Sequence, residues 1–504
     1  MYSSLIWILG SIAIYQVWKS VYRLYFHPLS KFPGPKLAAL TSGYEFYYNV
    51  IQRGSFIWEI ERMHQVYGPI VRINPREIHI KDSDYYDEIY ASSARKRDKD
   101  PRMVAQFGID GSVFSSVSAE THRQRRVPLD KFFSKQSITK MEHVIHANLQ
   151  KLYRHLEDAC ASHRVVSLDA GFAGFASDVI HRYGWGLNSG NLDAEDFNEH
   201  VRDGISALFR LSHVMFYFPI LQKLADSLPL WVLEKVNPFA FAVASQKLDL
   251  YRRAETVLRG SDGHSKEVGK GSIVDAIASP SMPAHMRTTS RVMDEGFALI
   301  IAGTETTARA LSFGAYYILS NPAIKTKLRE ELRQVMPTPD VQPTWNQLEQ
   351  LPYLSAVVSE TFRLGTGIAS RSPRIAPTEA LVYKEYVIPP GTLVSETNHF
   401  ILRDSSIFPD PHSFDPERWL RAAAKGERLD RYLVNFSKGT RICLGLNLAY
   451  AELFLVFATM IRRFDLELFE TSEKDIEFAR DFGTPYPEEG NFSLRATVSG
   501  IVPE

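Results

Sequence analysis

The chain has 504 residues, of which 45% are hydrophobic, so its composition supports a large core and excludes extensive disorder. Lys and Arg number 58, and so do Asp and Glu, which gives a formal net charge of zero. Because nucleic-acid-binding proteins normally carry a basic excess, this balance argues against a nucleic-acid partner. The only two cysteines are Cys160 and Cys443, and such sparse usage is typical of a reducing, cytosol-facing environment.

The N-terminal segment is apolar and uncharged over its first 18 residues, and hydrophobic residues continue past Lys19 and Arg23. That length is sufficient to cross a bilayer as a tilted helix. The positive charges follow the apolar run, which argues against a secretory signal and places the rest of the chain in the cytosol. We therefore predict a membrane anchor over residues 1–26, single-pass in the endoplasmic reticulum membrane. A buried N-terminal helix is the alternative.

The remaining residues, 27–504, contain no internal repeat and no evident domain boundary. Prolines after residue 27 form a stiff elbow. Helical patterns dominate 118–196 and 291–320, whereas strand patterns occur at 67–80 and 373–397. We expect one mainly α-helical domain with a smaller β region.

Two further segments are distinctive in composition. Residues 208–241 are unusually apolar, and they suit either a lipophilic entrance or membrane-facing surface, or ordinary core helix. Residues 260–271 are polar and rich in glycine, which predicts an exposed loop.

The strongest chemical signal is the segment Phe436-Ser-Lys-Gly439-Thr-Arg441-Ile-Cys443-Leu-Gly445. A cysteine thiolate on haem iron donates electron density that favours O–O cleavage, and backbone N–H groups around the sulfur tune it. Gly439 permits a tight turn, and Gly445 lets a following helix approach a flat ring. Arg441 can pair with a haem propionate, and Phe436 can pack beside the ligand. A structural cysteine in a glycine loop would leave these neighbours unexplained.

This segment matches the haem-binding signature of the cytochrome P450 family at every fixed position. The other motifs follow in the family's order, so the resemblance covers nearly the whole chain. The C-terminal half most resembles fungal trichodiene-oxygenase-type enzymes, over residues 363–368, 414–420, 446–453 and 481–485. The resemblance implies a cytochrome P450 fold preceded by one transmembrane helix, with haem b held by Cys443.

A second motif, Ala302-Gly-Thr-Glu305-Thr306-Thr, lies midway along the predicted helix at 291–320. Hydroxyl groups that bond to i−4 carbonyls can open a helix, and an acid next to an alcohol can relay protons. The resemblance assigns Glu305 and Thr306 to the acid–alcohol pair that delivers protons to bound O2.

A third motif, Glu360-Thr-Phe-Arg363, places opposite charges on one helical face. Because the helix is apolar, the pair should be buried and should need a further partner. The resemblance supplies Arg418, which completes a Glu–Arg–Arg triad. The triad is expected to serve folding and haem loading.

Propionate contacts are implied for His122, Arg126 and Arg374 by the resemblance, with Arg371 as a rival for the third position. A solvated basic face that docks a redox partner is the alternative reading of these cations. Substrate contacts are expected from five mostly apolar segments, namely 107–114, 209–216, 298–306, 367–373 and 482–485.

The implied reaction inserts one oxygen atom from O2 into a lipophilic small molecule. We expect a terpenoid, polyketide or alkaloid intermediate of fungal secondary metabolism. NADPH would supply electrons through the flavoprotein NADPH–cytochrome P450 reductase, with cytochrome b5 as an optional donor. Two alternatives are a haem-thiolate peroxide isomerase that needs no reductase and a haem-binding sensor without turnover. Glu305 and Thr306 argue against both, since neither needs a proton relay.

Overall fold

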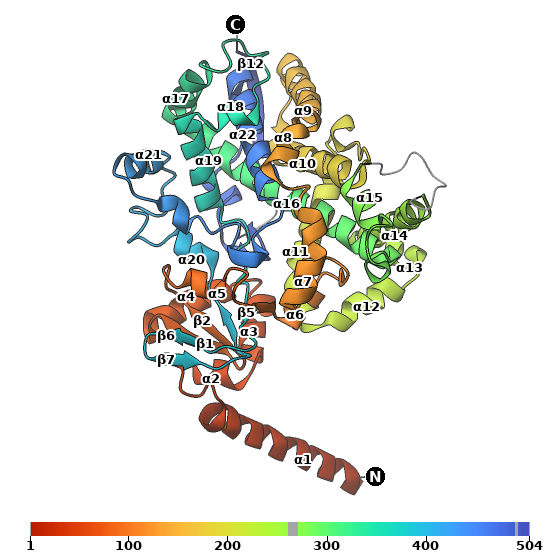
Figure 1. Cartoon of the computed structure of the whole chain (residues 1–504), viewed down its shortest axis with the longest axis vertical. Coiled ribbons are helices and arrows are strands. Elements are labelled where there is room, and N and C mark those ends of the chain that lie inside the picture. Colours follow the sequence, from red (N-terminus) through yellow and green to blue (C-terminus); the bar gives the residue numbers. More distant parts are fainter. Residues whose placement is uncertain (1, 261–270, 489–491, 503–504) are drawn as a thin grey trace.

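The computed structural model describes residues 2–260, 271–488 and 492–502 and folds them into a large helical body and a smaller β-rich region (Figure 1). The predicted mainly α fold with a smaller β part is therefore confirmed. Most of the stretch predicted as a loop at 260–271 lies outside the described residues.

The helical body begins after the first strands of the β region and extends to the C-terminal strands. Its helices are α6 (Pro101–Ala105), α7 (Ala119–Asp130), α8 (Lys135–Lys140), α9 (Glu142–Ser162), α10 (Leu168–Trp185), α11 (Glu199–Tyr217), α12 (Pro219–Ser227), α13 (Leu230–Val236), α14 (Pro238–Arg259), α15 (Ile273–Ala278), α16 (Thr289–Ser320), α17 (Pro322–Leu332), α18 (Trp345–Leu348), α19 (Pro352–Gly365), α21 (Glu417–Ala424) and α22 (Leu446–Arg463).

Helix α16 crosses the centre of this body and packs against both α10 and α22 (Figure 1). It begins where the Thr288 side chain caps it by accepting a hydrogen bond from the Arg291 N–H, and it ends before Asn321. Gly296 lies against the ring of Trp185 in α10, where any β-carbon would clash. The close approach of the two helices therefore requires glycine at this position.

The β-rich region is a five-stranded sheet of order β1-β2-β8-β5-β3 beside a two-stranded hairpin, β6-β7. Its strands are β1 (Ile70–Asn74), β2 (Glu77–Ile80), β3 (Asp98–Lys99), β5 (Arg374–Ile375), β6 (Leu381–Tyr383), β7 (Tyr386–Ile388) and β8 (Leu393–Ser395), and its helices are α2 (Lys36–Leu40), α3 (Gly43–Phe46), α4 (Phe56–Tyr67), α5 (Tyr86–Ile89) and α20 (Asn398–Leu402). The sheet joins strands from both halves of the chain. The strand predictions at 67–80 and 373–397 are confirmed.

Two short sheets are formed mainly by strands near the C-terminus. One has the order β4-β12-β9, and the other pairs β10 with β11. Their bounds are β4 (Val166–Ser167), β9 (Phe464–Leu468), β10 (Arg480–Asp481), β11 (Pro485–Tyr486) and β12 (Arg495–Ile501). Strand β12 lies between two strands that are distant in sequence.

Helix α1 (Tyr2–Val21) forms within the predicted anchor and extends away from the body (Figure 1). The prediction of a transmembrane span is not supported, because none of the helices in the described ranges combines sufficient length with sufficient apolarity to cross a bilayer. Polar or amphipathic side chains at Ser11, Tyr15 and Gln16 interrupt the apolar stretch of α1.

Part of the apolar segment 208–241 forms core helix and part forms an exposed apolar surface, so each of the two predictions holds for some of its residues. Phe209 and Leu233 are buried, as expected for core helix. Ile220 and Trp231, by contrast, are 57% and 65% exposed on α12 and α13. The segment therefore contributes both to the core and to an apolar surface.

Candidate functional site

The Cys443 loop is held by backbone contacts at both ends. The Cys443 N–H donates to the Phe436 carbonyl oxygen at 2.9 Å, which closes the loop. Gly439 has a φ of +69°, and a β-carbon there would clash with the carbonyl oxygens of Tyr90 and Ala91. A side chain would therefore be strained and obstructed here, so the loop requires glycine as predicted.

The Cys443 side chain is exposed, although the surrounding protein desolvates it. Burial raises the pKa of the thiol, while the Gly445 N–H hydrogen bond and the positive charge of Arg126 oppose the rise. Helix α22 begins at Leu446, so its positive end also favours a thiolate. The sulfur is therefore accessible although protein surrounds it.

Small or accessible residues leave room beside the sulfur. A β-carbon at Gly445 would meet only Cys443 Sγ, at 3.9 Å. Ala302 is exposed although it lies midway along the central helix α16, and Thr306, one turn later, is half-buried. Arg126 Nη1 donates to the Ile442 carbonyl at 2.8 Å, beside the cysteine.

Five basic side chains form a cluster near this loop. Burial, followed by the charges of Arg441 and Lys99, lowers the pKa of His122 to about 3. Burial and the neighbouring Arg374 also lower the pKa of Arg441, to about 10, and that of Lys99. Lys99 lies directly opposite Arg374 in the antiparallel pair β3–β5. Arg126 adds its charge to the same group.

Arg126 pairs with Asp130 at 2.5 Å, but three other members of the cluster have no such partner among the described residues. Within the described ranges, Lys99, Arg374 and Arg441 form no ion pair with a carboxylate; Lys99 Nζ donates to the Phe114 carbonyl at 2.7 Å instead. Buried like charges on facing strands are unfavourable unless an anion neutralises them. A haem presents two propionates, so the donor set fits this cofactor.

Arg371, the rival of Arg374, is already neutralised. Its Nε donates to Glu77 at 2.9 Å, and its guanidinium also pairs with Glu45. Arg374, by contrast, pairs with no carboxylate among the described residues and donates to Ser372. Lys99 was not predicted from sequence, because only the strand pairing of β3 with β5 brings it to Arg374.

Thr306 and Glu305 do not bond to each other. Thr306 Oγ1 donates to the Ala302 carbonyl at 2.7 Å, the i−4 bond that was predicted. Glu305 is buried, and its Oε1 accepts from Arg309 Nε at 2.5 Å and from the Tyr486 hydroxyl at 3.0 Å. The acid therefore points toward partners that sequence reasoning did not identify.

Four of the five predicted substrate segments meet in the structure. The ring centroids of Phe107 and Phe114 are 5.8 Å apart, and those of Phe107 and Phe209 are 5.9 Å apart. Gly483 lies against Phe209, and its carbonyl accepts the Ala369 N–H at 2.8 Å. The fifth segment belongs to α16, which packs against α11. An apolar pocket needs such converging aromatic segments.

The predicted triad is fully buried. Arg363 donates two hydrogen bonds to Glu360, at 2.8 and 2.7 Å, and Arg418 Nε donates a third at 3.0 Å. The Trp419 indole N–H and the Asp415 backbone N–H also donate to Glu360, each at 2.9 Å. The structure thus brings the three predicted residues together and adds two donors.

Known proteins resemble this chain over nearly its full length. The family model described as Cytochrome P450 matches residues 39–489. Conidiogenone synthase PchP450 of Penicillium rubens is 45% identical over 481 residues, covering 95% of this chain and 96% of the relative. Cytochrome P450 monooxygenase TRI4 of Trichoderma arundinaceum is 42% identical over 480 residues, covering 94% and 92%. The predicted likeness to fungal trichodiene-oxygenase-type enzymes is confirmed. The chain therefore belongs to the cytochrome P450 family of monooxygenases, which use haem iron and O2.

Proposed function

We propose that residues 27–504 form a haem-thiolate monooxygenase domain that oxidises a lipophilic terpenoid, polyketide or alkaloid intermediate of fungal secondary metabolism. The observation that carries this proposal is the accessible Cys443 beside a basic cluster in which Lys99, Arg374 and Arg441 have no carboxylate partner among the described residues. The similarity to conidiogenone synthase and to TRI4 supports the substrate class.

The roles of the predicted residues follow from their contacts. Haem b, when bound, supplies the iron that activates O2. Cys443 would provide the thiolate, Gly439 and Gly445 the room, and Phe436 the carbonyl that orders the loop. Arg441, whose guanidinium also bonds to the carbonyls of Ser116 and Val117, would draw the propionates toward a fixed position.

His122, Arg126 and Arg374 would share the remaining propionate contacts. Thr306 would hold a proton near bound O2, and Glu305 would supply it. The buried triad of Glu360, Arg363 and Arg418 would brace the fold without touching substrate.

Electrons would come from NADPH through a flavoprotein cytochrome P450 reductase, with cytochrome b5 as an optional donor. Helices α7 and α8 present exposed cations, including Arg123, which is 70% exposed, and Lys135, which is 49% exposed. An acidic reductase surface would complement them.

Membrane attachment is a separate part of the proposal. Trp7, Ile14 and Val17 on α1 are 77%, 72% and 64% exposed, and such apolar surface needs cover. We propose that it attaches the protein to the endoplasmic reticulum membrane, with the catalytic domain in the cytosol. Alkaline carbonate extraction of membranes from expressing cells checks this. Protein that resists extraction crosses the bilayer, released protein lies on its surface, and protein absent from membranes contradicts the proposal.

The spectrum of dithionite-reduced protein with carbon monoxide tests the ligand. Wild type should show the strongly red-shifted Soret band of haem-thiolate, and Cys443→Ala should lose it. Cys160→Ala is the matched control and should keep the band. Retention of the band in Cys443→Ala would exclude this residue as the ligand.

Turnover is tested with reductase, NADPH and a panel of cyclic terpene, polyketide and alkaloid precursors. Oxygenated product that depends on reductase supports the proposal. Isomerisation of an added peroxide without NADPH would favour the isomerase alternative. Haem binding without either activity would favour a sensor.

A further inference from the structure

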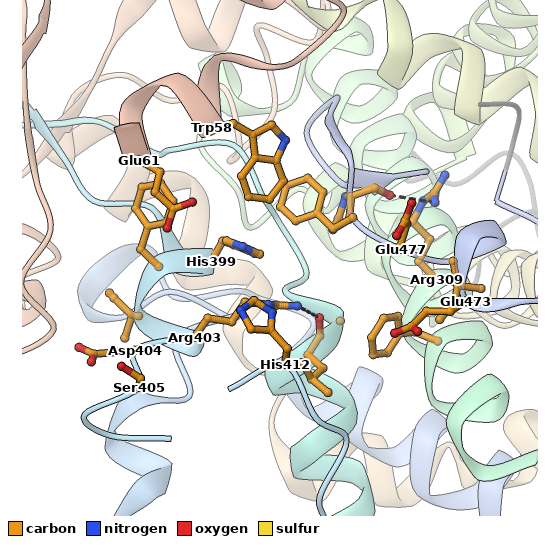
Figure 2. A pocket seen from close by; sticks show the side chains of 18 of the residues that line it. Trp58, Glu61, Arg309, His399, Arg403, Asp404, Ser405, His412, Glu473 and Glu477 are labelled. Carbon is orange, nitrogen blue, oxygen red and sulfur yellow. Dashed lines mark hydrogen bonds between the residues drawn. The ribbon is translucent and has the colours of Figure 1, made fainter. Parts of the chain in front are cut away.

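A polar cavity of about 540 Å³ lies between the β-rich region, α16 and the C-terminal strands (Figure 2). Its lining contains neither Cys443 nor Thr306. Charged side chains surround it, among them Glu61, Lys81, Arg403, Asp404, Glu473 and Glu477. A cavity of this size with several polar partners can hold many waters.

Arg309 connects this cavity to the buried acid Glu305. Arg309 lines the cavity, and Figure 2 shows it on the side nearest Glu473 and Glu477. Its side chain is 12% exposed, whereas that of Glu305 is 4% exposed. The guanidinium donates to Glu305 Oε1 through Nε and to the Pro485 carbonyl through Nη1, at 2.5 and 3.1 Å.

Tyr486 contacts both members of this pair. The Arg309 guanidinium lies 3.8 Å from the centroid of the Tyr486 ring. The Tyr486 hydroxyl is 3.0 Å from Glu305 Oε1 and 3.3 Å from the Ser206 carbonyl, and its single proton can serve one of them at a time. One of the donors that hold Glu305, the Tyr486 hydroxyl, can therefore change partners.

Arg309 itself cannot carry the proton. Burial works against its charge, but Glu305 and Tyr486 outweigh burial and raise the pKa of Arg309. A guanidinium that stays protonated can orient a carboxylate but cannot exchange protons with it. Arg309 can therefore orient the Glu305 carboxylate but does not transfer a proton to it.

We infer that Arg309 is a positioning residue that holds Glu305 toward the polar cavity, and that this cavity supplies the protons of the proposed relay. The inference rests on the proposed function. A proton from cavity water adds to the Glu305 carboxylate, which weakens the pair with Arg309. The neutral acid would then turn to Thr306 and give this proton to its oxygen, as the Thr306 hydroxyl releases its own proton on the side away from Glu305. Glu305 returns to Arg309 as a carboxylate.

The main test is the variant Arg309→Gln in the reconstituted holoenzyme. The measured quantities are product formed, hydrogen peroxide released and NADPH consumed. The substrate is a cyclic terpene hydrocarbon that wild type oxidises; without one, the ratio of peroxide to NADPH is the readout. Product per NADPH should fall about tenfold, less than the 10²-fold or more typical of losing a proton donor itself. Peroxide should rise to match, and the solvent deuterium isotope effect should increase. Arg309→Lys should restore part of the coupling.

Arg253→Gln is the matched control, because Arg253 forms an exposed i,i+4 pair with Asp249 on α14. It should leave coupling unchanged. If Arg309→Gln does not load haem, Tyr486→Phe decides the question, since it removes one donor to Glu305 and keeps the ring. Thermal unfolding of each variant supplies a readout independent of turnover.

The outcomes separate this inference from the proposed function. Raised peroxide in Glu305→Gln but not in Arg309→Gln or Tyr486→Phe would overturn the role of Arg309. A lower unfolding temperature with unchanged coupling would reduce the pair to a structural one and also overturn it. Unchanged coupling in both Glu305→Gln and Thr306→Ala would remove the relay and this inference together, while the thiolate spectrum and product formation would still stand.

Discussion

Two buried glutamates, Glu360 and Glu305, are each paired with an arginine on the same helix, but their surroundings differ. Glu360 accepts from two arginines, an indole and a backbone N–H, and both of its oxygens are used. Glu305 accepts from Arg309 and from a tyrosine hydroxyl with a second acceptor in reach. A saturated carboxylate is fixed, whereas a carboxylate with few, exchangeable donors beside a polar cavity can move. We propose that the number of donors separates the structural acid Glu360 from Glu305, the acid of the proposed relay.

The largest expected effect comes from breaking the saturated site. Arg363→Gln leaves buried charge without its bidentate partner and should lower the free energy of unfolding by about 3–5 kcal/mol. Urea denaturation of the haem-loaded protein measures this. Arg253→Gln, which breaks an exposed pair, should change stability by less than about 1 kcal/mol. If Arg363→Gln and Arg253→Gln changed the free energy of unfolding equally, the many donors around Glu360 would not be what makes its site stable.

At Glu305 we expect the reverse, namely a small loss of stability and a large loss of activity. Glu305→Gln keeps the shape of the side chain but removes its charge, so it should lower the free energy of unfolding by only about 1–3 kcal/mol. Product per NADPH should nevertheless fall at least about 10²-fold, because the amide cannot carry the proton. Parallel assays of stability and peroxide release check both parts. A stability loss as large as that of Arg363→Gln would contradict the comparison.

Lys99 extends the comparison to cations. Unlike Arg363, it is only half-buried and lies opposite another cation, and no carboxylate of the described chain pairs with it. Lys99→Met should therefore stabilise the haem-free protein by about 1 kcal/mol, since like charges on facing strands repel. The haem-loaded protein should release haem to apomyoglobin faster than wild type. Slower release would exclude Lys99 from the propionate site, and Lys99→Arg is the control that keeps the charge.

The smallest effect is expected at Tyr486. Tyr486→Phe removes one neutral donor to Glu305 and should lower the free energy of unfolding by about 0.5–1.5 kcal/mol. Urea denaturation measures it against Tyr67→Phe, a partly exposed control at the end of α4. A loss above that range would indicate that Tyr486 is part of a saturated site like that of Glu360.

Sequence reasoning predicted the parts of the site that are local. The Cys443 loop lies within ten consecutive residues, and the Glu360–Arg363 pair occupies one helical turn, so spacing alone defines both. The mainly helical fold followed from patterns of the same range. These features depend on neighbours along the chain rather than on tertiary contacts.

Contacts between segments that are distant in the chain could not be predicted from the sequence. Lys99 meets Arg374 only through strand pairing, and the pairing of Arg371 with Glu45 and Glu77 could not be predicted from the sequence. Glu305 could be named from its motif, but its partner Tyr486 could not, because β11 reaches α16 only in the folded molecule. The transmembrane prediction relied on the length of an apolar run and gave too little weight to the polar residues within it.

The β4-β12-β9 sheet has a consequence for how the protein is made. Strand β12 pairs with β4, so Val166 and Ser167 gain their partners Ala496 and Arg495 only after nearly the whole chain has left the ribosome. Tyr486, which contacts Glu305, emerges at about the same time. A chain that stalls before this point cannot complete either contact. Synthesis should therefore yield no active partial product, and nascent chains should depend on chaperones until translation ends.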